Sequence, residues 1–371
     1  MNQTKGVNRL FLAMAAISIA SPYLLGSFFN GLTIYQSLAV SQFIFFAPVL
    51  IYLLCTRGRV LEDLQVRMLT VPQLLRVLLL AVLLLPVMTW LNLVSMLFVE
   101  NYVSATFSEA GQASLGLNVM YIALIPAVSE EFMFRGVFYH GYRKAGILKG
   151  ALVSGLCFGL IHLNLNQFCY AFVLGVIFAV LVEITGSIYS SMIVHFCVNF
   201  SSVWSLSLQS ELSEAAGGSA AATVSDAVLR SSILSILGMY TVIALIFGTL
   251  AILVMRSLAR SCGRSEHMRA VFAGAAAEED GQISYASEAD NDPERDRTET
   301  TENFGQHSEV KETHESETVE GFGQKSSEMD EYEKAFRRQR RERDRRRIVT
   351  PSLIAAVALC LGYMVIFEVM L

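Results

Sequence analysis

The chain has 371 residues, of which 53% are hydrophobic and 16% charged, with a formal net charge of −5 and a mean hydropathy of +0.48. A soluble domain of this size carries more charge on its surface, so the composition excludes an ordinary soluble globular protein. We expect the lipid bilayer to be its surroundings, and we expect no nucleic-acid partner.

Long apolar stretches follow one another along most of the chain. A helix that crosses a bilayer needs about 20 mainly apolar residues. The predicted spans are 10–29, 36–55, 74–99, 117–139, 150–166, 168–184, 188–206, 232–255 and 349–369. No stretch shows the alternation of a barrel strand. The predicted fold is therefore all-α, a polytopic transmembrane helical bundle of about eight core spans plus one C-terminal span.

Basic residues lie in alternate loops between these predicted spans. Lys5 and Arg9 precede the first span, and further Lys and Arg residues follow the second, fourth and eighth spans. The loops 100–116 and 207–229 contain no Lys. Since cytoplasmic loops carry the excess of Lys and Arg, nine spans predict a cytoplasmic N-terminus in the plasma membrane.

The fourth predicted span contains the sequence SEEFMFRG, with Glu130, Glu131 and Arg135. Ionisable residues within spans are costly and usually functional. Glu131 and Arg135 are four residues apart, so they can pair on one face. Glu130 lies about 100° round the helix and can point elsewhere. Glu130 is therefore the better candidate for a general base or a metal ligand, although a structural role for all three residues is an alternative.

The fifth and seventh spans add two histidines. His162 lies four residues after Phe158, and His195 lies four residues before Asn199. A lone buried histidine is more often a satisfied core residue, but here two histidines and an asparagine accompany paired glutamates. Counting about 1.5 Å per residue places Glu130 and His195 nearer the cytoplasmic side and His162 deeper.

The segment after the eighth span has a different composition. Residues 265–330 are rich in Glu, Ser, Thr, Asp and Gly, and we expect them to be disordered. The basic residues of 334–347 predict contact with anionic lipid, or serve as a topology signal. The predicted organisation is 1–73 N-terminal spans, 74–206 catalytic core, 207–256 loop and eighth span, 257–347 disordered cytoplasmic loop ending in a basic helix, and 348–371 C-terminal span.

The residue types within the spans favour chemistry through activated water. The sequence contains no H-E-x-x-H motif, no G-x-S-x-G motif and no phosphate-binding glycine loop. In one arrangement, His162, His195 and a glutamate such as Glu130 bind a divalent metal such as zinc, which leaves a position for water. In the other, Glu130 activates water that His162 holds, while His195 and Asn199 stabilise the oxyanion. Spacing leaves both open.

The three motifs, in this order and spacing, resemble the CPBP family, which includes the CAAX prenyl endopeptidases and the Abi proteins. The resemblance covers residues 74–206, and the T-G-S sequence that usually precedes the last motif is present at 185–187. It implies an all-helical membrane core and peptide-bond hydrolysis near the membrane surface. Family members are described both as metalloproteases and as metal-independent glutamate proteases. The resemblance implies catalytic roles for Glu130, His162, His195 and Asn199, and supporting roles for Glu131 and Arg135.

The leading hypothesis is an intramembrane endopeptidase that cleaves a membrane-anchored peptide or protein near the cytoplasmic face. A non-catalytic bacteriocin-immunity or scaffold protein is a second hypothesis, which predicts loss of catalytic residues. A proton-coupled transporter is a third, and it predicts inverted repeats.

Overall fold

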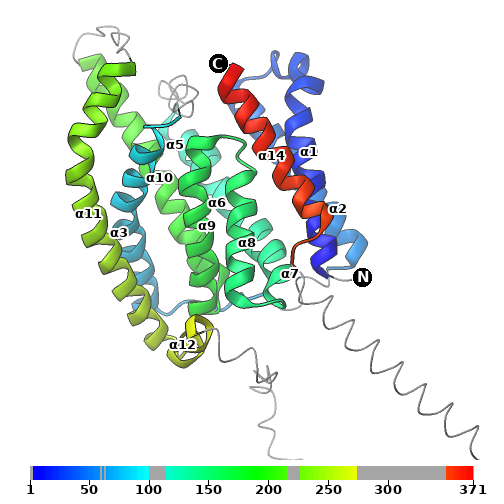
Figure 1. Ribbon diagram of the computed structural model, residues 1–371, viewed down its shortest axis with the longest axis vertical. Helices are drawn as coiled ribbons and strands as arrows, with labels where there is room; N and C mark the ends of the chain where they lie inside the picture. Colours follow the sequence, from blue (N-terminus) through cyan, green and yellow to red (C-terminus); the bar gives the residue numbers. More distant parts are fainter. Residues whose placement is uncertain are drawn as a thin grey trace, which may run out of the picture. The chain divides into compact units, whose positions relative to one another are not determined.

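A computed structural model describes residues 3–58, 61, 64–99, 114–215, 226–273 and 348–370 (Figure 1). The helices are α1 (Gln3–Phe29), α2 (Ile34–Thr56), α3 (Val71–Ser95), α5 (Leu115–Asn118), η3 (Val119–Leu124), α6 (Ile125–Glu131), η4 (Phe132–Tyr139), α7 (His140–Arg143), α8 (Ile147–Leu160), α9 (Leu165–Thr185), α10 (Ile188–Ala215), α11 (Asp226–Ser261), α12 (Ser265–Ala273) and α14 (Pro351–Met370). Within these ranges, β-structure is limited to an isolated antiparallel β-bridge between Val66 and Ser187. The all-α fold is therefore confirmed.

Eight helices of the described chain are long and apolar enough to cross a membrane. They are α1, α2, α3, the continuous helix Leu115–Arg143, α9, α10, α11 and α14. The predicted fifth span, 150–166, is wrong in length, because α8 has 14 residues and ends at Leu160. The apolar sequence runs on into the following turn, so composition does not mark this end.

The helix Leu115–Arg143 alternates between α and π winding along its length. Its π-helical segments η3 and η4 flank the short α-helical segment α6, which ends at Glu131. The π-helix is rare and frequently occurs at functional sites. The motif SEEFMFRG thus lies where the winding changes from α to π.

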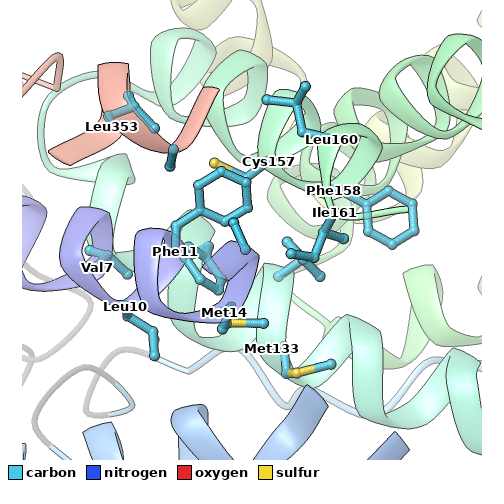
Figure 2. Packing of buried hydrophobic residues seen from close by; sticks show 14 of the residues in the cluster. Val7, Leu10, Phe11, Met14, Met133, Cys157, Phe158, Leu160, Ile161 and Leu353 are labelled. Carbon is cyan, nitrogen blue, oxygen red and sulfur yellow. The ribbon is translucent and has the colours of Figure 1, made fainter. Parts of the chain in front are cut away.

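Two apolar clusters hold the bundle together. One joins α1 and α14 to the helix Leu115–Arg143 and to α8. Figure 2 shows Phe11 and Met14 of α1 near Cys157 of α8, with Leu353 of α14 alongside. The other joins α3, α9, α10 and α11. Between membrane spans such side chains stabilise the bundle mainly through van der Waals contacts, because lipid tails are as apolar as the side chains themselves.

Two glycines allow α8 and α9 to cross closely. A Cβ atom built on Gly175 would lie 2.7 Å from the Cα atom of Gly155, and one built on Gly155 would lie 2.8 Å from the backbone nitrogen of Val176. Small residues of this kind let helix backbones approach each other in membrane proteins.

A tight turn sets where α10 begins. Gly186 has φ +65°, a left-handed conformation that glycine adopts without steric cost. The backbone N–H of Ser187 donates to Thr185 Oγ1 at 3.2 Å, and that of Ile188 donates to the carbonyl oxygen of Gln65 at 2.8 Å. The T-G-S sequence therefore fixes the start of the helix that carries His195.

The region after α11 differs in part from our expectation. Residues 257–261 and 265–273 are helical, so the prediction that a disordered loop begins at residue 257 is wrong there. Residues 274–347, with the predicted basic segment 334–347, lie outside the described residues. One compact unit comprises Met1–Val271 and Arg345–Leu371.

Candidate active site

The centre of the site is a buried ion pair. Arg135 Nη1 donates to Glu131 Oε1 at 2.8 Å, and neither side chain is exposed. Arg135 Nη2 donates to the backbone carbonyl of Gly175 at 2.9 Å. The missing side chain at Gly175 leaves room for this contact, since a Cβ there would lie 3.2 Å from Arg135 Nη2. The four-residue spacing predicted the ion pair, but not its link to α9.

His195 hydrogen-bonds to the same carboxylate. Its Nδ1 atom lies 3.0 Å from Glu131 Oε1. A carboxylate that pairs with arginine accepts hydrogen bonds, so we assign a hydrogen to Nδ1. His195 Nε2 then faces Glu130, whose Oε2 atom lies 3.9 Å away. One imidazole thus connects the two adjacent glutamates.

Glu130 and Glu131 have different surroundings although they are neighbours in sequence. The Glu131 side chain has no exposed surface, whereas that of Glu130 is 17% exposed. The 3.9 Å separation from His195 is too long for a direct hydrogen bond. A water molecule that bonds to both atoms fits such a separation. Glu130 is therefore the carboxylate that can reach a water or a substrate.

His162 lies in the turn after α8, and not within a span as predicted. Its Nδ1 atom is 2.7 Å from the carbonyl oxygen of Phe158. Since a carbonyl only accepts, Nδ1 donates and Nε2 is the nitrogen with the lone pair. The next residue, Leu163, has φ +54°, an uncommon conformation for a residue other than glycine. Such strained positions cluster at functional sites.

The ring of Phe158 stands between the two histidines. Its centroid lies 5.0 Å from that of His162 and 5.7 Å from that of His195. The Arg135 guanidinium carbon lies 4.6 Å from the Phe158 centroid and 5.0 Å from that of Phe178. The aromatic rings thus form an apolar wall with cation–π contacts to the buried arginine.

Asn199 lies one turn beyond His195 on α10. Its Nδ2 atom donates to the backbone carbonyl of Ile122 in η3 at 3.3 Å. This bond uses one of its two N–H groups and leaves the second for another acceptor. Asn199 thereby ties α10 to the helix that carries the glutamates.

The metal arrangement of Glu130, His162 and His195 lacks support from the geometry. Among the residues that the structure describes, no group of three or more His, Cys, Asp or Glu side chains is placed to hold a metal ion. One His195 nitrogen is bonded to Glu131 and one His162 nitrogen to Phe158. These bonds engage Nδ1 of each ring and leave Nε2 for another partner, so the metal arrangement stays a prediction, and no step below uses a metal.

A second buried carboxylate, Glu183, lies within the predicted span 168–184, and the sequence gives it no role. Glu183, near the end of α9, has no exposed side-chain surface and bonds to Tyr139, Arg143 and His267. These partners come from two stretches of the chain, the end of the helix Leu115–Arg143 and α12, and both stretches are more than 35 residues from Glu183, so no local spacing relates Glu183 to them. The single signal in the sequence was a carboxylate within an apolar span.

The fold and the site together define a polytopic helical membrane protein with a glutamate–histidine centre between its helices. Residues 112–201 match the family model described as type II CAAX prenyl endopeptidase Rce1-like. This segment, which contains the six predicted site residues, is therefore similar to that family, and the resemblance seen in the motifs is confirmed. No curated protein and no solved structure matches the chain.

Proposed function

We propose that the chain is an intramembrane endopeptidase that hydrolyses a membrane-anchored peptide or protein without a metal. The observation that carries this proposal is the position of His195, which is bonded to Glu131 by one nitrogen and faces Glu130 with the other. The match to the type II CAAX prenyl endopeptidase Rce1-like family supports the same reaction class.

In the proposed reaction, Glu130 removes a proton from a water molecule, whose oxygen attacks the scissile carbonyl carbon. The lone pair on His162 Nε2 accepts the other hydrogen bond of this water. The tetrahedral oxyanion is stabilised by Asn199 and by protonated His195. The carbon–nitrogen bond then breaks as the Glu130 proton passes to the leaving amine, which restores the carboxylate.

Glu131 and Arg135 act on this reaction through His195. The Glu131 carboxylate orients the imidazole and stabilises its protonated form, as a carboxylate does in other histidine pairs. Two carboxylates, one guanidinium and one imidazolium then add up to no net charge. This balance matters because an unpaired charge inside a membrane protein is costly.

The test uses purified protein in lipid vesicles with a panel of membrane-anchored peptides, including prenylated C-terminal peptides. We expect the wild type to cleave at least one peptide and Glu130→Gln to cleave none. Glu211→Gln, at an exposed carboxylate of α10, is the matched control and should cleave as the wild type does. Equal cleavage by Glu130→Gln and wild type would exclude Glu130 as the base. No cleavage by any variant would favour the immunity or scaffold hypothesis.

We also propose a plasma-membrane location, with the N-terminus and residues 257–347 cytoplasmic and with anionic lipid bound at 334–347. The alternation of basic residues supports the orientation. A cysteine introduced at Gln3 should resist a membrane-impermeant thiol reagent in intact cells and react after lysis. Cysteine-free background variants remove the signal of the six native cysteines.

A further inference from the structure

Two buried polar side chains from other helices bind the helix that carries the proposed catalytic glutamates. Both bind it at one turn, Tyr139–Arg143, and we call them anchors. This turn lies 8 to 12 residues after Glu131, at the end of the span Leu115–Arg143. The stretch between them is the π-helical segment η4. A change between π and α winding here would rotate one end of the helix relative to the other. Since Glu130 and Glu131 differ by about 100° in direction, such a rotation would exchange their surroundings.

The first anchor is Glu183 of α9. Tyr139 Oη donates to Glu183 Oε1 at 2.7 Å, and Arg143 Nη2 donates to Glu183 Oε2 at 3.1 Å. Arg143 Nε also donates to Oε1. Because Tyr139 and Arg143 are four residues apart, Glu183 binds one face of the helix at two points.

The same carboxylate binds α12. His267 Nε2 donates to Glu183 Oε2 at 3.2 Å, and Arg264 Nη1 donates to the Glu183 backbone carbonyl at 2.9 Å. In Figure 1, α12 lies at the end of the bundle where α9 ends. The buried carboxylate is thus fully used in joining α9 and α12 to the helix of Glu130 and Glu131.

The second anchor is Asn8 of α1, which has no exposed surface. Its Oδ1 atom accepts from Tyr142 Oη at 2.7 Å. Its Nδ2 atom donates to the carbonyl of Ile348 and to Thr350 Oγ1, both at 2.8 Å. Asn8 therefore ties the same turn to α1 and to the residues that begin α14.

We propose that Glu183 and Asn8 are positioning residues that fix the rotation of the helix carrying Glu130 and Glu131. They hold Tyr139, Tyr142 and Arg143 from two neighbouring sides of the bundle. The described residues on either side of 274–347 contact the two positioning residues, α12 through Glu183 and Ile348 through Asn8. Neither Glu183 nor Asn8 contacts the reacting atoms. The effect of Glu183 and Asn8 on the cleavage rate rests on the proposed function. Their effect on the rotation of the helix does not depend on it.

The test compares Glu183→Gln and Asn8→Leu with Glu266→Gln in the full-length protein in lipid vesicles. Glu266 is the exposed neighbour of His267 on α12 and serves as the matched control. Hydrogen exchange followed by mass spectrometry reports on 125–143 and on the other helices. Peptide cleavage gives kcat and KM separately.

We expect Glu183→Gln and Asn8→Leu to speed exchange in 125–143 but not in α3 or α11. We expect kcat to fall about 10- to 100-fold with little change in KM, because a small misplacement of catalytic groups has effects of that size. Glu266→Gln should match the wild type in both measurements.

Three results would overturn the proposal. Unchanged exchange in 125–143 for both variants would show that the anchors do not hold the helix. Faster exchange in every helix alike would show a general loss of stability instead of positioning. Faster exchange in 125–143 with kcat unchanged would show that the helix rotation does not affect catalysis. If the wild type cleaves no peptide, the proposed function fails, and the exchange data alone still decide whether the anchors hold the helix.

Discussion

At the scale of single residues, adjacent glutamates have separate tasks because a helix turns them toward different neighbours. Glu131 is enclosed by Arg135 and His195, whereas Glu130 retains exposed surface. Removing one partner of a buried ion pair leaves the other charge uncompensated, at a cost of about 3–5 kcal/mol. Glu131→Gln should therefore lower the thermal unfolding temperature and abolish cleavage. Glu130→Gln should abolish cleavage and leave the unfolding temperature unchanged. Equal unfolding temperatures for the two variants would contradict this division.

Metal dependence is the second question at this scale. Because no three potential ligands converge within the described ranges, we expect cleavage to persist after dialysis against a strong chelator. Elemental analysis of the dialysed protein should show zinc well below one atom per chain. Loss of cleavage on chelation, restored by zinc and by no other addition, would instead support the arrangement of Glu130, His162 and His195.

The sequence predicted the contact of the site that joins residues close together in the chain, and it missed a contact between residues far apart. The Glu131–Arg135 pair follows from a four-residue spacing on one helix. The bond from His195 to Glu131 joins residues 64 positions apart, on helices whose relative rotation no local pattern reports. For that reason the sequence predicted the pairing of Glu131 with Arg135 but not the hydrogen bond between Glu131 and His195.

At the scale of helices, the crossing of α8 and α9 controls the site through glycine. Gly175→Ala would place a methyl group 2.7 Å from the Gly155 Cα atom and 3.2 Å from Arg135 Nη2. Both backbones would have to move apart, and overpacking of this kind costs about 1–3 kcal/mol. We expect a lower unfolding temperature and weaker cleavage. Gly238→Ala in α11 is the control, since nothing lies within 4 Å of its added methyl group. Equal effects of the two substitutions would show that the crossing is not tight.

Helix existence was easier to predict than helix ends or helix winding. Apolar length predicted α9 and α10 well, because a membrane span must satisfy its backbone internally. The end of α8 was missed because Ile161 and Leu163 are as apolar as the helix before them. The π-helical winding of η3 and η4 was missed for a related reason. In a mostly apolar membrane span, polar and apolar residues do not alternate regularly enough to distinguish an α-helix from a π-helix.

At the scale of the whole molecule, one compact unit is built from residues that precede and residues that follow a long internal segment of the sequence. That unit comprises Met1–Val271 and Arg345–Leu371, and α14 packs against α1 within it. Its C-terminal part is attached by the hydrogen bonds from Asn8 to Ile348 and Thr350. The composition of 265–330 placed a boundary in this region, but it did not reveal that α12 belongs to the helical core.

Replacing residues 274–344 by a flexible Gly/Ser linker should therefore leave the bundle folded. We expect the unfolding temperature and the size-exclusion profile in detergent to match those of the full chain, because the replaced residues lie outside the compact unit. A longer replacement, 274–350, with glycine at 348 and 350, removes the Thr350 hydroxyl that accepts from the Asn8 amide and the buried Ile348 side chain. A buried donor left without a partner costs about 1–3 kcal/mol, so this second variant should unfold at a lower temperature. If the shorter replacement already unfolds the bundle, the internal segment contributes to the core. If the longer one has no effect, Asn8 does not anchor α14.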